Sequence, residues 1–163
     1  MDPGQCSKRS DGIWVCGDCG FAYDRTSDEL LRNLKNAPPL MTKAVRGLDD
    51  NVVDEAPRPG LWTRRQYVAH LADWAEISLS RVDRIITEES PVIEDIDQDV
   101  LAAEHGYETA ARDLEVRLTG EPTASWERVG IRAALSEPQT LRLYMSDLVH
   151  ELEHHLVDLI GAR

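Results

Sequence analysis

The chain has 163 residues, which suffices for one hydrophobic core with a small appendage but hardly for two full domains. Its formal net charge is -12, because 30 acidic residues face 18 lysines and arginines. Nucleic-acid binding requires a basic face that contacts phosphates, so this charge argues against a nucleic-acid partner. No apolar run approaches the roughly 20 residues that cross a bilayer, and the first residues lack the apolar middle of a signal peptide. We therefore expect a cytoplasmic protein without a membrane partner.

The first 25 residues form a predicted head that contains all three cysteines of the chain. Cys16 and Cys19 belong to a CxxCG sequence, whose spacing lets two thiolates bind one Zn²⁺. Gly20 permits the strained backbone of such a turn. Cys6 supplies a third sulfur. In a reducing compartment, a cluster with an odd number of cysteines suggests metal binding rather than a disulfide.

A tetrahedral zinc site needs four ligands, and the chain has no fourth cysteine. His105, His150 or His154 could complete the set if the head folds back on the rest of the chain. Structural Zn²⁺ is the preferred interpretation. Redox or thiol chemistry at Cys16 and Cys19, or idle thiols, are the alternatives.

A first helix is predicted to begin after Thr26, because Thr26 and Glu29 have the spacing of a capping box and an apolar stripe follows. Pro38 and Pro39 interrupt this helix and predict a kink or a restart. A loop rich in Pro and Gly follows, with Thr63 as the expected N-cap of the next helix.

Three further helices are predicted over about 64–88, 97–118 and 141–160, the last of them after Thr140. The stretch between the last two is short and irregular, and we expect it to wrap across one end of the bundle. Four long amphipathic segments predict an all-α protein, an antiparallel four-helix bundle over 26–163 behind the head of 1–25. Metal sites in such bundles are built from side chains of facing helices.

The last predicted helix carries the sequence HELEHHL, which contains two pairs of potential ligands four residues apart. Residues at this spacing are neighbours on one face of a helix. The phase of the surrounding leucines turns Glu151 and His155 toward the core, and turns His150 and His154 toward the face that is expected to meet water. A buried Glu151 needs a cation or a hydrogen-bonding partner.

His70 lies at the edge of the apolar stripe of the second helix, in the sequence HLAD. Together, His70, Glu151 and His155 would give three ligands from two helices and leave one position open, which is the pattern of a catalytic zinc site. Each residue also has a simpler interpretation, since an inward histidine is often a hydrogen-bonded core residue and a flanking glutamate is usually solvated. Asp73 could accept a hydrogen bond from the ring of His70.

Residues from about 27 to 160 resemble the DinB-like superfamily of bacterial metal-binding four-helix bundles, most specifically in HLAD and HELEHHL. The resemblance implies a divalent metal, Zn²⁺ or Ni²⁺ among others, held by His70, Glu151 and His155. This triad is similar to the branch of mycothiol-dependent maleylpyruvate isomerase, whereas branches with three histidines would carry His at position 151. The resemblance does not cover the head.

The same resemblance implies an S-transferase that joins a low-molecular-weight thiol, such as mycothiol or bacillithiol, to a small electrophile. A metal-dependent hydrolase is equally compatible with an open metal position. The other alternative is a metal- or redox-responsive regulatory module without enzymatic activity. The sequence leaves open whether the protein forms a homodimer. An enzyme predicts a cavity beside the metal position, whereas a regulator predicts a closed site and an exposed apolar patch near the head.

Overall fold

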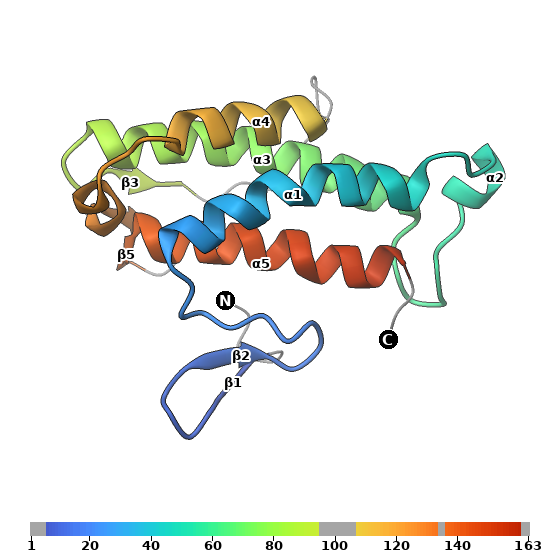
Figure 1. Cartoon of the computed structure of the whole chain (residues 1–163), viewed down its shortest axis with the longest axis horizontal. Coiled ribbons are helices and arrows are strands. Elements are labelled where there is room, and N and C mark those ends of the chain that lie inside the picture. Colours follow the sequence, from blue (N-terminus) through green and yellow to red (C-terminus); the bar gives the residue numbers. More distant parts are fainter. Residues whose placement is uncertain (1–5, 95–106, 134–135, 161–163) are drawn as a thin grey trace.

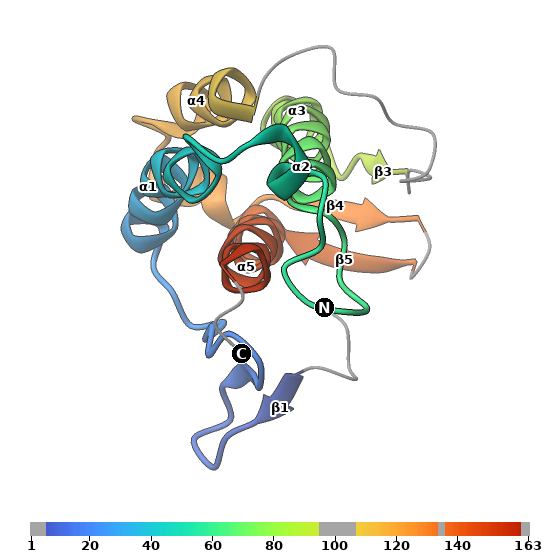
Figure 2. The ribbon, with the colours of Figure 1, turned by 90° about the vertical axis from the view of Figure 1, so that its right-hand side faces the viewer.

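The computed structural model describes residues 6–94, 107–133 and 136–160. Four long helices form a bundle (Figure 1): α1 (Ser27–Val45), α3 (Arg64–Thr87), α4 (Tyr107–Leu118) and α5 (Leu141–Leu159). α1 and α3 each pack against both α4 and α5. The end view therefore shows the order α1, α4, α3, α5 around the bundle axis (Figure 2). The predicted four-helix bundle is confirmed.

The centre of the bundle is built from the apolar stripes of the four helices. Fully buried leucines come from every long helix, and they include Leu30, Leu34, Leu71, Leu114, Leu118, Leu148 and Leu152. Since apolar burial is the main favourable term in folding, this leucine core fixes which face of α3 and α5 points inward.

The helix starts follow the predicted capping signals. The Thr26 hydroxyl accepts a hydrogen bond from the Glu29 backbone N–H, and the Glu29 carboxylate accepts one from the Thr26 N–H. Thr63 and Gln66 form the same reciprocal pair at the start of α3, and Thr140 caps α5. These caps satisfy backbone donors that a helix leaves unpaired at its first turn.

Two helix predictions differ from the structure or lie partly outside its described range. α1 continues through Pro38 and Pro39 as one helix, with the Pro38 ring buried, so no restart occurs there. Burial of the ring within the core offsets the backbone hydrogen bonds that the prolines cannot make. The predicted start of the third helix near residue 97 lies outside the described residues, and α4 is described from Tyr107.

The sequence analysis missed the small elements around the bundle. They are α2 (Asp50–Val53), a 3₁₀ helix (Thr123–Glu127) and a sheet of β3 (Val92–Ile93), β4 (Val129–Arg132) and β5 (Glu137–Thr140). β4 is central, and it pairs in parallel with β3 and antiparallel with β5. The irregular stretch before α5 thus folds as the predicted cover at one end, anchored by the buried Trp126.

The head packs against α5 (Figures 1 and 2). Its hairpin joins β1 (Cys6–Lys8) to β2 (Trp14–Cys16). Phe21 is fully buried, and the Arg25 guanidinium lies 4.2 Å over its ring. Arg25 also donates to both oxygens of Glu153 on α5, at 2.5 and 2.9 Å. Apolar burial and a bidentate ion pair therefore hold the head in place.

Within the described residues, no helix is both long enough and apolar enough to span a membrane.

The bundle core predicts a contrast between two positions of α4. Leu114 is fully buried and Val116 is 66% exposed. Leu114→Ala should lower the free energy of unfolding by about 2–5 kcal/mol, because it leaves a cavity in the core. Val116→Ala should change it by less than about 0.5 kcal/mol. Chemical denaturation followed by circular dichroism measures both values, and equal effects would contradict the described core.

Candidate active site

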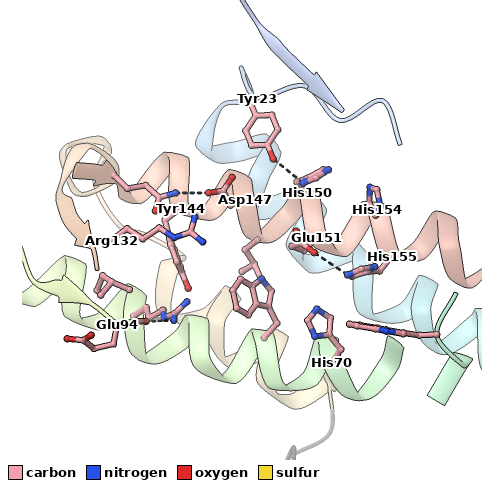
Figure 3. Close-up of a pocket in the computed structure, with 16 residues that line it drawn as sticks. Tyr23, His70, Glu94, Arg132, Tyr144, Asp147, His150, Glu151, His154 and His155 are labelled. Atoms are coloured by element: carbon pink, nitrogen blue, oxygen red, sulfur yellow. Dashed lines mark hydrogen bonds and ion pairs between the residues drawn. The ribbon is translucent and has the colours of Figure 1, made fainter. Parts of the chain in front are cut away.

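The structure brings together His70 of α3 with Glu151 and His155 of α5. One ligand atom from each residue lies within 4.8 Å of those of the other two. The Glu151 carboxylate oxygen Oε2 lies 3.1 Å from His155 Nε2. Figure 3 shows these side chains turned toward the space between α5 and α3, as the helical phase predicts.

Aromatic rings surround the two histidines of this cluster. The Trp62 indole lies over the His155 ring at 5.9 Å between centroids and meets the His70 ring edge-on at 5.1 Å. Tyr67 contacts His155 at 5.1 Å, and Trp74 stacks on His70 at 6.3 Å. This packing limits the rotation of both imidazoles, so their nitrogens stay near the carboxylate.

The electrostatics of the cluster favour the forms that bind a metal. Burial and the neighbouring His155 lower the pKa of His70, which keeps its imidazole neutral. Burial opposes ionisation of Glu151, but the hydrogen bond that its carboxylate accepts from His155 helps to hold its pKa below the ordinary value. Neutral imidazole and ionised carboxylate are the ligand forms required for a divalent metal, so the donor set fits one.

A buried aspartate, which the sequence analysis did not single out, lies beside the His155 ring on the side away from Glu151. Asp158 Oδ2 lies 3.6 Å from His155 Nδ1, while the other ring nitrogen of His155 faces Glu151. This separation is longer than a hydrogen bond, and His155 Nδ1 has no hydrogen-bond partner among the described residues, so Asp158 is a neighbour of the ring without bonding to it. The sequence signal was its place three residues after His155 on the same helix. Asp73, which was predicted to accept a hydrogen bond from His70, makes none to His70 in the described part of the chain.

A cavity of about 660 Å³ extends from this cluster along α3 and α5. Its walls come from both helices, the head and the small sheet, and sixteen residues line it: Tyr23, Trp62, His70, Trp74, Arg81, Ile93, Glu94, Arg132, Gln139, Tyr144, Asp147, Leu148, His150, Glu151, His154 and His155. The volume lies within the range of small-molecule sites.

The end of the cavity away from His70 is polar (Figure 3). Arg81 lies 5.5 Å over the Trp74 ring and donates to the backbone oxygen of Glu94. Arg132 of β4 also faces the cavity, and sequence reasoning missed it because the sheet was not foreseen. Arg84, three residues further along α3, pairs with Glu88 at 3.0 Å and does not line the cavity.

Two further polar groups from α5 complete this end. The Tyr144 hydroxyl lies 3.0 Å from the Ser78 hydroxyl, within hydrogen-bonding distance. Asp147 accepts a hydrogen bond from the Gln139 amide at 2.6 Å. Burial raises the pKa of Asp147 and that of Tyr144. The cavity thus extends from the potential metal ligands His70, Glu151 and His155 to an end that presents two arginines and several hydrogen-bonding groups.

A second group of ligand atoms lies between the head and α5. Cys16, Cys19, His150 and His154 each place one such atom within 4.8 Å of the others. The prediction that His150 and His154 meet water is wrong, because their exposed fractions are 4% and 6%. They do point away from the bundle core, but the head covers that face of α5 (Figure 3).

The third predicted sulfur is not part of this group. Cys6 lies opposite Cys16 in the hairpin register, but it does not belong to the group. The group contains both His150 and His154, where one histidine was predicted. The helical spacing of His150 and His154 is the reason, since both follow one face of α5 and reach the head together. His105, the other predicted ligand, lies outside the described residues.

Burial strongly perturbs two members of this second group. It lowers the pKa of His150 to about 4. It also raises the pKa of the Cys19 thiol to about 12. Because thiolates are the reactive form of cysteine, a thiol with such a pKa is a poor nucleophile near neutral pH.

The fold and the cluster of His70, Glu151 and His155 define a class of four-helix bundles. In this class, two facing helices present a His, Glu and His set beside a cavity. Residues 33–161 match the family model of the DinB superfamily, and the chain belongs to that superfamily. The match begins after the head, so the family does not account for the cysteines.

The relatives carry names that point to metal-dependent chemistry. A Bacillus licheniformis protein, named as a proposed metal-dependent hydrolase, is 32% identical over 87% of this chain and 88% of its own length. YfiT of Bacillus subtilis, with a similar name, is 31% identical over 61% of this chain and 56% of its own length. The sequence alignment with YfiT therefore spans about half of that protein.

Solved structures agree with the family. The structure of YfiT, described as a probable metal-dependent hydrolase with an unusual four-helix bundle topology, aligns with a TM-score of 0.73 and 25% identity over 85% of this chain and 88% of YfiT. A mutant of mycothiol-dependent maleylpyruvate isomerase aligns with a TM-score of 0.62 over 84% of this chain and 62% of its own. At 16% identity, this second likeness concerns the fold alone.

Two glutamates of α5 predict different consequences for metal binding. Glu151→Gln removes the anionic ligand of the cluster formed by His70, Glu151 and His155. Loss of a residue that only supports a metal ligand lowers affinity about 10–100-fold, so this variant should weaken divalent-metal binding by more than that. Glu153→Gln is the matched control, since Glu153 holds Arg25 and Asn33 instead. Competition titration with a coloured chelator measures both affinities, and equal weakening would count against Glu151 as a ligand.

Proposed function

We propose that the protein is a divalent-metal-dependent S-transferase that joins a low-molecular-weight thiol, of the mycothiol or bacillithiol type, to an electrophilic small molecule. One observation carries this proposal: a cavity of about 660 Å³ connects the cluster of His70, Glu151 and His155 with an end that presents Arg81 and Arg132. A regulatory module would need no such cavity, so the observation favours an enzyme.

His70, Glu151 and His155 would hold the metal, which when bound supplies a Lewis acid that lowers the pKa of a thiol or water beside it. Three protein ligands leave a coordination position for this group. Trp62 and Trp74 pack against the ligand rings and restrict access of water from their side. The chain thus fixes the ligands and shapes a partly shielded reaction space.

The polar end of the cavity suits an anionic group of the thiol or of its acceptor. Arg81 and Arg132 can pair with a carboxylate, a geometry for which guanidinium groups are well matched. The buried indole N–H of Trp74 has no hydrogen-bond partner among the described residues, so it can donate to a bound ligand. These contacts would orient the substrate while its sulfur lies at the other end.

The proposed reaction is balanced without a redox partner. The thiol loses its proton, and its sulfur forms a bond to an electrophilic carbon. In an addition, the proton ends on the neighbouring atom of the acceptor. In a substitution, the leaving group departs with the displaced electron pair and takes up the proton.

A metal-dependent hydrolase is the second candidate, and the names of the relatives favour it. The same ligands and cavity would serve water as the nucleophile. The two candidates differ in whether a thiol is required for turnover.

A thiol screen tests the proposed function. The purified protein, loaded with Zn²⁺ or Ni²⁺, should convert a low-molecular-weight thiol and an electrophile into a conjugate that mass spectrometry detects. Chelation and Glu151→Gln should abolish the conjugate, whereas Glu153→Gln should retain it. Cleavage of ester or amide substrates without a thiol would establish the hydrolase instead, and inactivity with every thiol and substrate class would reject both enzymes.

The role of Arg81 can be tested with a neighbouring arginine as control. Arg81→Ala should raise the KM for an anionic thiol about tenfold or more, because a hydrogen bond to a charged group contributes about 1.5–3 kcal/mol. Arg84→Ala should leave KM nearly unchanged, since Arg84 does not line the cavity. Steady-state kinetics measures both. A similar rise for the two variants would mean that the effect is general electrostatics rather than contact in the cavity.

A further inference from the structure

The head brings two cysteines to a face of α5 that already carries two histidines. We propose that Cys16, Cys19, His150 and His154 bind one Zn²⁺, a second metal site that fastens the head to the bundle. One ligand atom from each of the four residues lies within 4.8 Å of the other three. The donors come from segments more than a hundred residues apart in sequence, and this convergence requires the folded chain.

The backbone of the head presents both sulfurs to the same side. Cys16 ends β2, and its carbonyl accepts a hydrogen bond from the Gly20 N–H at 3.0 Å. The Cys16 N–H in turn donates to the Phe21 carbonyl at 2.9 Å. Gly20 has a φ of +76°, a left-handed conformation that favours glycine. This closed turn is the knuckle that two cysteines use to share one metal.

The two histidines are buried, and one ring nitrogen of each is placed to bind a metal. His154 Nδ1 lies 3.6 Å from Cys16 Sγ. His150 Nε2 is fully buried and has no hydrogen-bond partner in the part of the chain that the structure describes. A buried polar atom without a partner costs about 1–3 kcal/mol, and a metal bond would remove that cost.

The opposite nitrogen of each ring has a neighbour that fixes its orientation. The Tyr23 hydroxyl lies 3.0 Å from His150 Nδ1, and Asp158 Oδ2 lies 3.7 Å from His154 Nε2. Histidines that bind metals are supported in this way, with the second nitrogen facing a polar group. The metal-binding nitrogens are therefore Nε2 of His150 and Nδ1 of His154.

The chemistry of the donor set selects the metal. Two thiolates and two imidazoles are a common tetrahedral ligand set of structural zinc sites, and soft sulfur ligands disfavour Mg²⁺ or Ca²⁺. With all four positions occupied, the site has no place for a substrate. Its role is to hold the head, including Tyr23, as one wall of the cavity.

Metal analysis of the full chain tests this site separately from the reaction. The wild-type protein should bind one equivalent of Zn²⁺ at each of the two clusters. Cys16→Ser and Cys19→Ser should each lose one equivalent, and Cys6→Ser, the matched control in the same hairpin, should lose none. Cys6 is also buried, so the control carries a similar risk to folding.

Substitution with Co²⁺ gives a readout that does not depend on activity, and its first test needs only the wild-type protein. The wild-type protein and Glu151→Gln should both show thiolate-to-cobalt charge-transfer absorption, because only the head site contains sulfur. Cys16→Ser should weaken it. No charge-transfer band in the wild type, or equal loss in Cys6→Ser and Cys16→Ser, would overturn the assignment. Retention of the band in a protein that fails the thiol screen would leave the head site intact and reject only the proposed reaction.

Discussion

The angular step of the α-helix is the constraint on which the site depends. Residues four apart share a face, whereas adjacent residues are turned by about 100°. In α5 the pair His150 and His154 therefore faces the head, and the pair Glu151 and His155 faces α3. One helix thus serves two clusters on different sides. The leucine core holds its rotation, so packing of the bundle interior determines the direction of all four donors.

Much of the fold could be predicted from the sequence because its signals are local. The periodic leucines and the capping residues Thr26, Thr63 and Thr140 depend on neighbours within one or two helical turns. The inward direction of Glu151 and His155 follows from the same periodicity. Their meeting with His70 needed the further assumption of a bundle, which the four long amphipathic segments predicted and the resemblance to a family supported.

The remaining features depend on contacts between distant segments. Nothing in the period of α5 reveals that a head will cover His150 and His154, so an apparently outward face is buried. The exclusion of Cys6 follows from where the hairpin meets α5, which the cysteine spacing does not encode. Arg132 enters the cavity through a sheet of very short strands, whose pattern is too brief to recognise.

Asp158 occupies the space behind both clusters at once. Its Oδ2 atom lies 3.7 Å from His154 Nε2 and 3.6 Å from His155 Nδ1. The Asp158 side chain is itself buried, with an exposed fraction of 4%. One buried side chain is therefore a neighbour of a histidine from each cluster, and a change at position 158 would alter the surroundings of both.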